Sequence, residues 1–255
     1  MIQIDKHPFV VLLASFFVMW LSMWIGTSMR EKQSDLDEEA RKDIDVIVAA
    51  TLTLLGLIIG FSFSMAINRY DQRKVYEEAE ANAIGTEYVR ADLLPAADAA
   101  NVQEDLKKYL DQRILFYTTR NERKVEQIDE DTSRLQTELW SAVRMPALAQ
   151  PTPVAALVVS GMNDVLNSQG YTQAAWWNGI PFGAWALMIA IAICSNLLVG
   201  YARRRVGKGV MRHLLLPIVL SIAFAFIADI DSPRWGTIVV HPQNLISLRQ
   251  SLPSQ

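Results

Sequence analysis

Five small or polar residues recur along one apolar segment and could line a path for ions. Thr53, Gly56, Gly60, Ser64 and Asn68 follow one another at spacings of three or four, so they share one face of a helix. Gly56 and Gly60 form a G-x-x-x-G pair, which lets two membrane helices pack closely. The alternative is a polar, small-residue wall of a pore or ligand path. Both interpretations place this face at an interface.

A second group of polar residues closes the last apolar segment. Asp229 and Asp231 are followed at once by Pro233 and Arg234. Carboxylates at a membrane boundary could bind a cation. More often such a pair ends a helix and interacts with a neighbour such as Arg234, and boundary carboxylates are less constrained than those inside a membrane.

Catalytic patterns are missing from the sequence. His7, His213 and His241 lie far apart and lack the spacing of metal ligands. The sequence contains no G-x-S-x-G, P-loop or H-E-x-x-H motif. Ser195 and Ser221 lie in apolar runs without a candidate base other than His213. We therefore predict no enzymatic activity, no cofactor and no metal site.

Membrane helices must position these residues. The 255-residue chain has 24 basic and 27 acidic residues, yet four long stretches contain none of them. These stretches are Pro8–Met29, Val46–Ile67, Ile180–Ala202 and His213–Ala228. A helix that crosses about 30 Å of hydrocarbon needs roughly 20 apolar residues. The distribution predicts four spans, over residues 8–29, 44–67, 180–201 and 211–229.

This distribution also excludes several classes of protein. A cytosolic globular enzyme, a disordered chain or a secreted disulfide scaffold would not concentrate its apolar residues in this way, and the net charge of −3 argues against nucleic acid as a partner. The first run could be a signal peptide, but it exceeds the usual h-region of about 7–15 residues and lacks an A-x-A-like site.

Asn196, in the third run, should face protein or water, because an unpaired amide is costly in lipid.

Residues 68–179 form the only sizeable polar region, with apolar residues at helical spacing. The pattern predicts helices over Asn68–Leu94, Asp98–Thr119, Glu122–Arg144 and Val154–Ser168, with Pro146, Pro151 and Pro153 as a linker and Gly170 as a stop signal. Their apolar stripes favour an antiparallel bundle or packing against neighbouring subunits.

The predicted fold class is therefore all-α. It comprises an N-terminal transmembrane hairpin (1–67), an extramembrane helical insert between the second and third spans (68–179), a C-terminal transmembrane hairpin (180–230) and a short tail (231–255).

The charges near the spans predict which side of the membrane each part occupies. The short loops, 30–43 and 202–212, carry nine basic residues, against six close to the spans on the opposite side. Because basic loops stay in the cytoplasm, this places the short loops inside the cell and the insert across the inner membrane from them. The dense cluster Arg203–Arg205 contributes most and could contact anionic lipid headgroups.

A stretch just beyond the second span has a composition that helix preference does not explain. It reads Glu78-Ala-Glu-Ala-Asn82-Ala-Ile-Gly85-Thr86, followed by Arg90-Ala-Asp92-Leu-Leu-Pro95. A glycine inside a helix costs about 1 kcal/mol relative to alanine. Gly85 therefore indicates close approach of another helix of the subunit, a symmetry mate or a ligand, and packing is the interpretation that we favour.

This stretch resembles the signature of the bestrophin-like domain family of bacterial membrane proteins. Arg69 and Arg73 before it, the element Asp229–Gly236 and the order of two spans, insert and two spans extend the resemblance over most of the chain. The family has no assigned function. True bestrophins are pentameric anion channels with four spans and a cytoplasmic helical region. The resemblance thus implies a homo-oligomer in the lipid bilayer and small ions as partners, with a sidedness opposite to the charge count.

Two functions follow as hypotheses. In the first, an oligomer conducts or gates small ions, with the second span beside the path and Glu78–Arg90 in a vestibule. In the second, the protein is a non-conducting sensor or scaffold whose insert binds a partner or ligand. An intramembrane enzyme is disfavoured, because the catalytic groups are missing.

Overall fold

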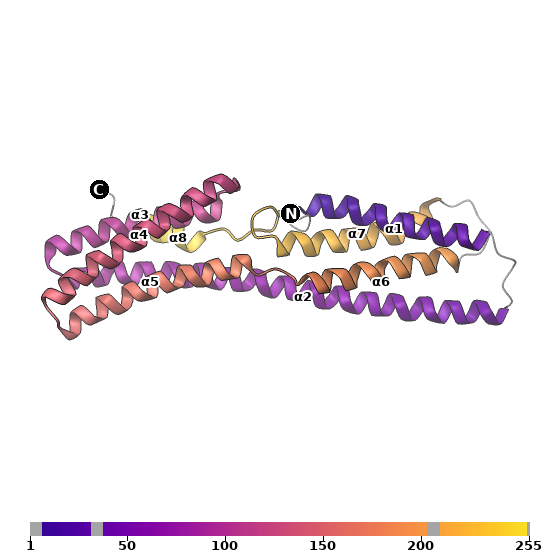
Figure 1. Ribbon diagram of the computed structural model, residues 1–255, viewed down its shortest axis with the longest axis horizontal. Helices are drawn as coiled ribbons and strands as arrows, with labels where there is room; N and C mark the ends of the chain where they lie inside the picture. The colour runs from indigo at the N-terminus through magenta and orange to yellow at the C-terminus, as the bar shows by residue number, and fades with distance from the viewer. Residues whose placement is uncertain (1–6, 32–37, 203–209, 254–255) are drawn as a thin grey trace. The chain divides into compact units, whose positions relative to one another are not determined.

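The structure, a computed structural model, describes residues 7–31, 38–202 and 210–253 (Figure 1). That part of the chain is nearly all helical and contains no strand. The long helices are α1 (Pro8–Glu31), α2 (Glu38–Arg90), α3 (Ala96–Thr118), α4 (Glu122–Ala149), α5 (Pro153–Trp177), α6 (Phe182–Tyr201) and α7 (Val210–Asp231); the shorter elements are η2 (Ala91–Leu93) and α8 (Gln243–Ser251). The basic cluster Arg203–Arg205 lies outside the described residues, as do residues 32–37 of the first short loop and 203–209 of the second.

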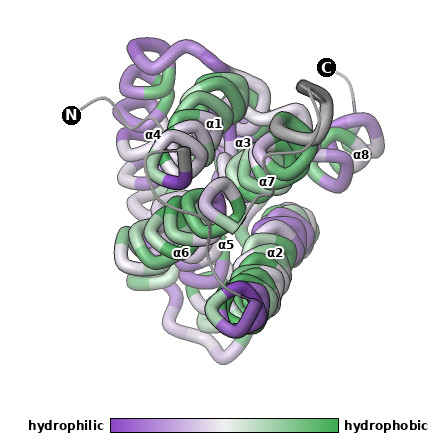
Figure 2. The backbone as a smooth tube through the Cα atoms, turned by 90° about the vertical axis from the view of Figure 1, so that its right-hand side faces the viewer, coloured by the Kyte–Doolittle hydropathy of each residue, from purple (hydrophilic) through white to green (hydrophobic). Residues whose placement is uncertain are grey.

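Four helical runs are long and apolar enough to cross a membrane. They are Pro8–Arg30, Glu38–Leu93, Pro153–Tyr201 and Leu214–Asp231, and each contains a strongly apolar window. Figure 2 shows α1, α6 and α7 as predominantly hydrophobic. The chain is therefore an all-α integral membrane protein with four transmembrane helices, as the charge-free stretches predict.

The chain divides into two compact units. The first comprises the residues up to Arg69 and Gly179–Val239, and the second comprises Tyr70–Asn178 together with the residues from Val240 onward. The helix α2 contributes to both. The helix α8, which follows α7 in the chain, belongs to the second unit.

In the first unit, α1 packs against both α6 and α7, and α6 also touches α7. The first part of α2 buries one stripe, Leu55, Ser62 and Ala66. Large apolar side chains point outward on all sides; Leu13 on α1 is 70% exposed and Leu215 on α7 is 64% exposed. Such exposure is costly in water and is what a lipid environment stabilises.

In the second unit, α3 packs against α4 and α8, and α4 packs against α5. The core consists of apolar residues from each helix: Ala81 and Ile84 on α2, Val102, Leu106 and Leu110 on α3, Leu139 and Val143 on α4, Val158, Met162 and Val165 on α5, and Leu245 on α8. The core residues of α3, α4 and α5 follow the stripes expected from the sequence, whereas Ala81 and Ile84 of α2 and Leu245 of α8 do not belong to an expected stripe. The second unit is a helical bundle with one core.

Two helix boundaries differ from the sequence prediction. The helix α4 continues through Pro146 to Ala149, and α5 continues through Gly170 to Trp177. Pro146 lies in the last turn, where the loss of one backbone hydrogen bond is tolerable. The cost of Gly170 is offset by the burial of Thr172, Ala175 and Trp176 beyond it. The linker is thus reduced to residues 150–152, with the Thr152 hydroxyl accepting a hydrogen bond from the backbone N–H of Ala155 at 3.1 Å.

Candidate functional site

The small and polar face of α2 points away from the rest of the first unit. Thr53, Gly56, Gly60, Ser64 and Asn68 are all exposed. A methyl group added to Gly56 or Gly60 would meet no atom within 4 Å. The stripe Leu55, Ser62 and Ala66, on the other side of the helix, is buried. The G-x-x-x-G pair therefore packs against nothing in the described part of the subunit, which leaves its face free for a neighbouring subunit or a water-filled path.

Close helix packing occurs instead at Gly26 of α1 and Gly200 of α6. A methyl group on Gly26 would overlap the backbone carbonyl of Leu197, and one on Gly200 would overlap that of Met23. Small residues permit this approach of two backbones within a membrane. These two glycines belong to no G-x-x-x-G motif, and the sequence gives no signal that pairs them.

Three polar residues of α6 and α7 are buried within the first unit. Asn196 and Ser195 are 0% exposed and Ser221 is 1% exposed. The Asn196 amide donates to the carbonyl of Ala192 at 2.8 Å, and the Ser221 hydroxyl donates to the carbonyl of Pro217 at 2.6 Å. Their orientation toward protein is the one expected for polar groups in a membrane helix.

Asp229 binds the chain that follows α7. Its Oδ1 accepts the backbone N–H of Thr237 at 2.6 Å, and its Oδ2 accepts the Thr237 hydroxyl at 2.8 Å and the N–H of Ile238 at 3.0 Å. Gly236 leaves room for this loop, because a methyl group there would overlap the backbone carbonyl of Asp229. The carboxylate thus closes a tight turn.

Asp231, the last residue of α7, contacts the start of α6 and the interior of α2 in the first unit. Its Oδ2 accepts the backbone N–H of Ile180, just before α6, at 2.9 Å, and its Oδ1 lies 4.0 Å from Nε of Arg69 on α2. Arg234 lies half-buried in the same loop. Such contacts are those of a structural boundary. Among the described residues, no group of three or more His, Cys, Asp or Glu side chains could hold a metal ion.

Most of the signature residues lie on the surface of the second unit. Glu78, Asn82, Thr86, Asp92 and Pro95 are exposed, and Gly85 and Arg90 are half-buried. The Asp92 carboxylate accepts a hydrogen bond from Gln103 of α3 at 2.8 Å, which ties η2 to that helix. The exposed residues are available to solvent or to another molecule.

Gly85 allows α8 to pack closely against α2. A methyl group at Gly85 would lie 3.0 Å from Cδ1 of Leu248, closer than side chains normally approach. The helix that needs this close approach belongs to the same subunit. This contact agrees with the packing interpretation of the mid-helix glycine.

The neighbouring Glu77, which the signature does not include, binds the N-terminus of α8. Its Oε1 accepts the backbone N–H groups of Asn244 at 2.9 Å and Leu245 at 3.0 Å, and its Oε2 accepts the Asn244 amide at 2.6 Å. A carboxylate is favoured there because it meets unpaired N–H groups and the positive end of the helix dipole. Arg249 further along α8 pairs with Asp111 of α3 at 2.7 Å.

Replacement of Glu77 by alanine is expected to release α8. The loss leaves backbone donors without their acceptor and costs about 1–3 kcal/mol by the usual penalty for unpaired buried groups. Hydrogen exchange of residues 243–251 should become faster in Glu77→Ala. The exposed neighbour provides the control: Glu78→Ala should leave the exchange of α8 unchanged, and equal exchange in both variants would contradict this role of Glu77.

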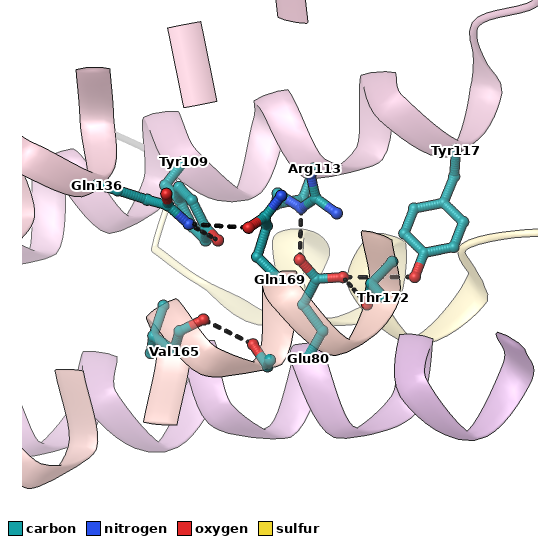
Figure 3. A network of polar contacts seen from close by, with 9 residues as sticks. Glu80, Tyr109, Arg113, Tyr117, Gln136, Val165, Gln169 and Thr172 are labelled. Atoms are coloured by element: carbon teal, nitrogen blue, oxygen red, sulfur yellow. Dashed lines mark hydrogen bonds and ion pairs between the residues drawn. The ribbon is translucent and has the colours of Figure 1, made fainter. Parts of the chain in front are cut away.

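A buried charged pair holds three helices of the second unit together (Figure 3). Glu80 of α2 accepts Nε–H of Arg113 on α3, and both side chains are 0% exposed. The other oxygen of Glu80 accepts the hydroxyls of Thr172 on α5 at 3.0 Å and Tyr117 on α3 at 3.4 Å. The Arg113 guanidinium also lies over the ring of Phe116, 4.5 Å from its centroid.

Tyr109 and Gln136 extend this polar centre. The Gln136 amide donates to the Tyr109 hydroxyl at 3.5 Å and to Gln169 at 3.4 Å (Figure 3). Burial raises the pKa of Tyr109 and that of Tyr117 well above the usual value, so both phenols stay protonated. The network specifies how α2, α3, α4 and α5 pack, and its partners are all within the subunit.

The comparison with protein families now decides the identity of the fold. The model of the family described as bestrophin-like domain matches residues 12–245. The chain belongs to the bestrophin-like domain family. No curated protein matches it. This membership agrees with the resemblance carried by the stretch Glu78–Pro95.

Solved structures support the same fold for this bestrophin-like chain. A bacterial bestrophin homologue from Klebsiella pneumoniae is similar with a TM-score of 0.60 and 14% identity, over 95% of this chain and 98% of that one. A single-residue variant of that homologue gives a TM-score of 0.61 and 13% identity, over 95% and 96% of the two chains. At this identity the likeness shows the fold alone.

In this bestrophin-like subunit, three carboxylates of α2 are buried that the sequence pattern does not mark as site residues: Glu77, Glu80 and Glu87. Glu78, which the sequence pattern includes among the signature residues, is exposed. At helical spacing, these three carboxylates continue the stripe of Leu55, Ser62, Ala66 and Arg73, which only the structure identifies as the buried side of the same helix. Extension of that stripe beyond the membrane would have placed them in the core.

Proposed function

We propose that this bestrophin-like protein forms a homo-oligomer in the inner membrane and conducts small ions along the outward face of α2. The observation that carries the proposal is the uncovered face of Thr53, Gly56, Gly60, Ser64 and Asn68 in the first unit. Symmetric assembly would bring equal faces of α2 around one axis, where small residues leave an open path.

The chemistry of this face favours water over lipid. The exposed Thr53 hydroxyl donates to the carbonyl of Ala49 at 2.8 Å, and its oxygen can still accept a hydrogen bond from water. Asn68 exposes an amide at the membrane end of the segment. Polar groups without partners are costly in hydrocarbon, whereas in a pore they contact water and ions. The exposed leucines on α1 and α7 suit lipid, and α2 also exposes Leu57, Phe61 and Ile67 beside this face.

Ion flux and oligomeric mass test the proposal together. Purified protein in liposomes should dissipate an imposed ion gradient, and its mass in detergent should be a multiple of the subunit mass. Gly60→Trp should abolish the flux, because a ring on this face fills the path, while the subunit still folds. A monomeric protein without flux would contradict the proposal.

Sidedness is the second part of the proposal. The charge count places loops 30–43 and 202–212 in the cytoplasm, whereas the resemblance to bestrophins places the insert there. Replacement of Cys194 by alanine removes the single cysteine. A cysteine introduced at exposed Glu126 of α4 then reports the side of the insert. Labelling from outside intact spheroplasts by an impermeant reagent supports the charge count, and labelling only after lysis supports the resemblance.

A non-conducting scaffold is the second candidate function. The end of α4 and the start of α5 expose large apolar side chains on the second unit: Met145 is 63% exposed, Leu148 is 65% exposed and Leu157 is 52% exposed. Apolar patches outside a membrane mark binding surfaces. A complex that purifies with the wild-type protein and is lost in Leu148→Glu, without any flux in liposomes, would favour this function.

A further inference from the structure

Glu87 is a buried carboxylate that the proposed conduction path does not use. It lies near the end of α2 and is 0% exposed, and neither of its oxygens has a hydrogen-bond partner in the described part of the chain. This differs from Glu77 and Glu80, whose oxygens accept hydrogen bonds. A charged carboxylate without partners in a protein interior is strongly unfavourable, while its protonated form costs much less.

The surroundings of Glu87 make its charge state matter to packing. The carboxylate fits against Gly161 of α5, because a methyl group on Gly161 would overlap its Oε2 and would lie 2.5 Å from a terminal nitrogen of Arg90. The helix α2 ends at Arg90, and η2 follows directly. The contact of Glu87 with Gly161 is therefore the point at which α5 closes on the end of α2.

Two charged groups act on this carboxylate. Arg90, on the same helix, favours the ionised form, and Asp164 of α5 opposes it. Asp92 of η2 is exposed and bonded to Gln103 of α3. Burial outweighs Arg90 and, with a smaller contribution from Asp164, raises the pKa of Glu87 to about 8.

We propose that Glu87 is a proton-binding site that couples pH to the packing of α5 on the end of α2. With a proton on Glu87, α5 closes over the neutral side chain at Gly161. After loss of the proton, the unpaired charge favours local opening that exposes it to water. The inference rests on the second unit alone and holds whether or not the protein conducts ions.

The direction of the pH effect follows from linkage. In the closed state Glu87 keeps its proton up to about pH 8, whereas in the opened state it is a solvated carboxyl that loses the proton near its ordinary pKa. Between these values the opened state binds fewer protons. Opening therefore becomes more favourable by up to about tenfold per pH unit from pH 5 to 8, and it levels off above that range.

Hydrogen exchange of the full-length protein tests the proposal. The measured quantity is the exchange rate of amides 158–165 in α5, compared between wild type and Glu87→Gln at each pH from 5 to 9, so that the intrinsic pH dependence of exchange cancels. The ratio of the wild-type exchange rate to the Glu87→Gln exchange rate should be smallest at pH 5 and should rise roughly tenfold per pH unit toward pH 8. A ratio that is constant from pH 5 to 9 would overturn the proposal.

A second variant separates titration of Glu87 from a structural role. Arg90→Gln removes the positive charge that favours ionisation in the closed state, so the pH at which α5 opening levels off, the upper limit of its pH range, should move upward relative to wild type. This test keeps Glu87 in place and does not require Glu87→Gln to fold. An unchanged range in Arg90→Gln would contradict a role for Glu87 ionisation.

Discussion

Replacement of Arg113 by methionine should lower the thermal midpoint of the purified protein by roughly 10 °C. The change leaves the buried carboxyl of Glu80 without its charged partner, with only the hydroxyls of Thr172 and Tyr117 still in contact with it. Removal of one partner of a buried ion pair costs about 3–5 kcal/mol, and each kcal/mol shifts the midpoint of a chain of this size by about 2–4 °C.

Two further variants test whether the loss of stability in Arg113→Met comes from the buried pair. Arg134→Met removes an arginine from exposed pairs with Asp131 and Glu138 on α4, and it should leave the thermal midpoint close to that of wild type, because solvent screens such pairs. The double variant Glu80→Gln/Arg113→Met removes both charges and should recover part of the loss. If Arg113→Met and Arg134→Met have equal thermal midpoints, the buried pair does not hold the bundle together.

Replacement of Gly200 by leucine should have the second large effect, in the membrane. Even the first carbon of the side chain would overlap the carbonyl oxygen of Met23 and would lie 3.1 Å from the backbone nitrogen of Thr27. Because backbone atoms of two packed helices cannot yield locally, α1 and α6 must separate. We expect a loss of about 3 kcal/mol or more, at the upper end of overpacking costs.

The matched control is Gly56→Leu on α2, where a side chain meets no atom of the described subunit. It should leave the thermal midpoint of the subunit within a few degrees of wild type while reducing ion flux. Equal destabilisation by Gly200→Leu and Gly56→Leu would show that the G-x-x-x-G pair also packs inside the subunit. That result would contradict the outward orientation of α2.

The sequence predicts what depends on one helix at a time. The charge-free stretches give the four spans, and the spacing from Thr53 to Asn68 gives one face of α2. Which way this face points depends on the buried stripe of Leu55, Ser62 and Ala66, whose apolar residues look the same in lipid as in a protein core.

Pairing between distant segments is the part that the sequence does not reveal. Glu80 and Arg113 lie 33 residues apart on different helices, and Gly26 and Gly200 meet the backbone of the facing helix only when α1 and α6 pack. Neither pair has local spacing that distinguishes it from a surface charge or an incidental glycine. The helix extensions past Pro146 and Gly170 likewise depend on tertiary packing that offsets a local cost.

The central claim is that the uncovered face of α2 lines an ion path, and thiol modification tests it most directly. In a Cys194→Ala background, cysteines replace Ser64 on this face and, as control, Leu13 on α1, which is 70% exposed toward lipid. Ion flux into liposomes is measured before and after a small charged thiol reagent is added. Modification should block the flux in Ser64→Cys and leave it unchanged in Leu13→Cys. Flux that persists after complete modification of Ser64→Cys would contradict it.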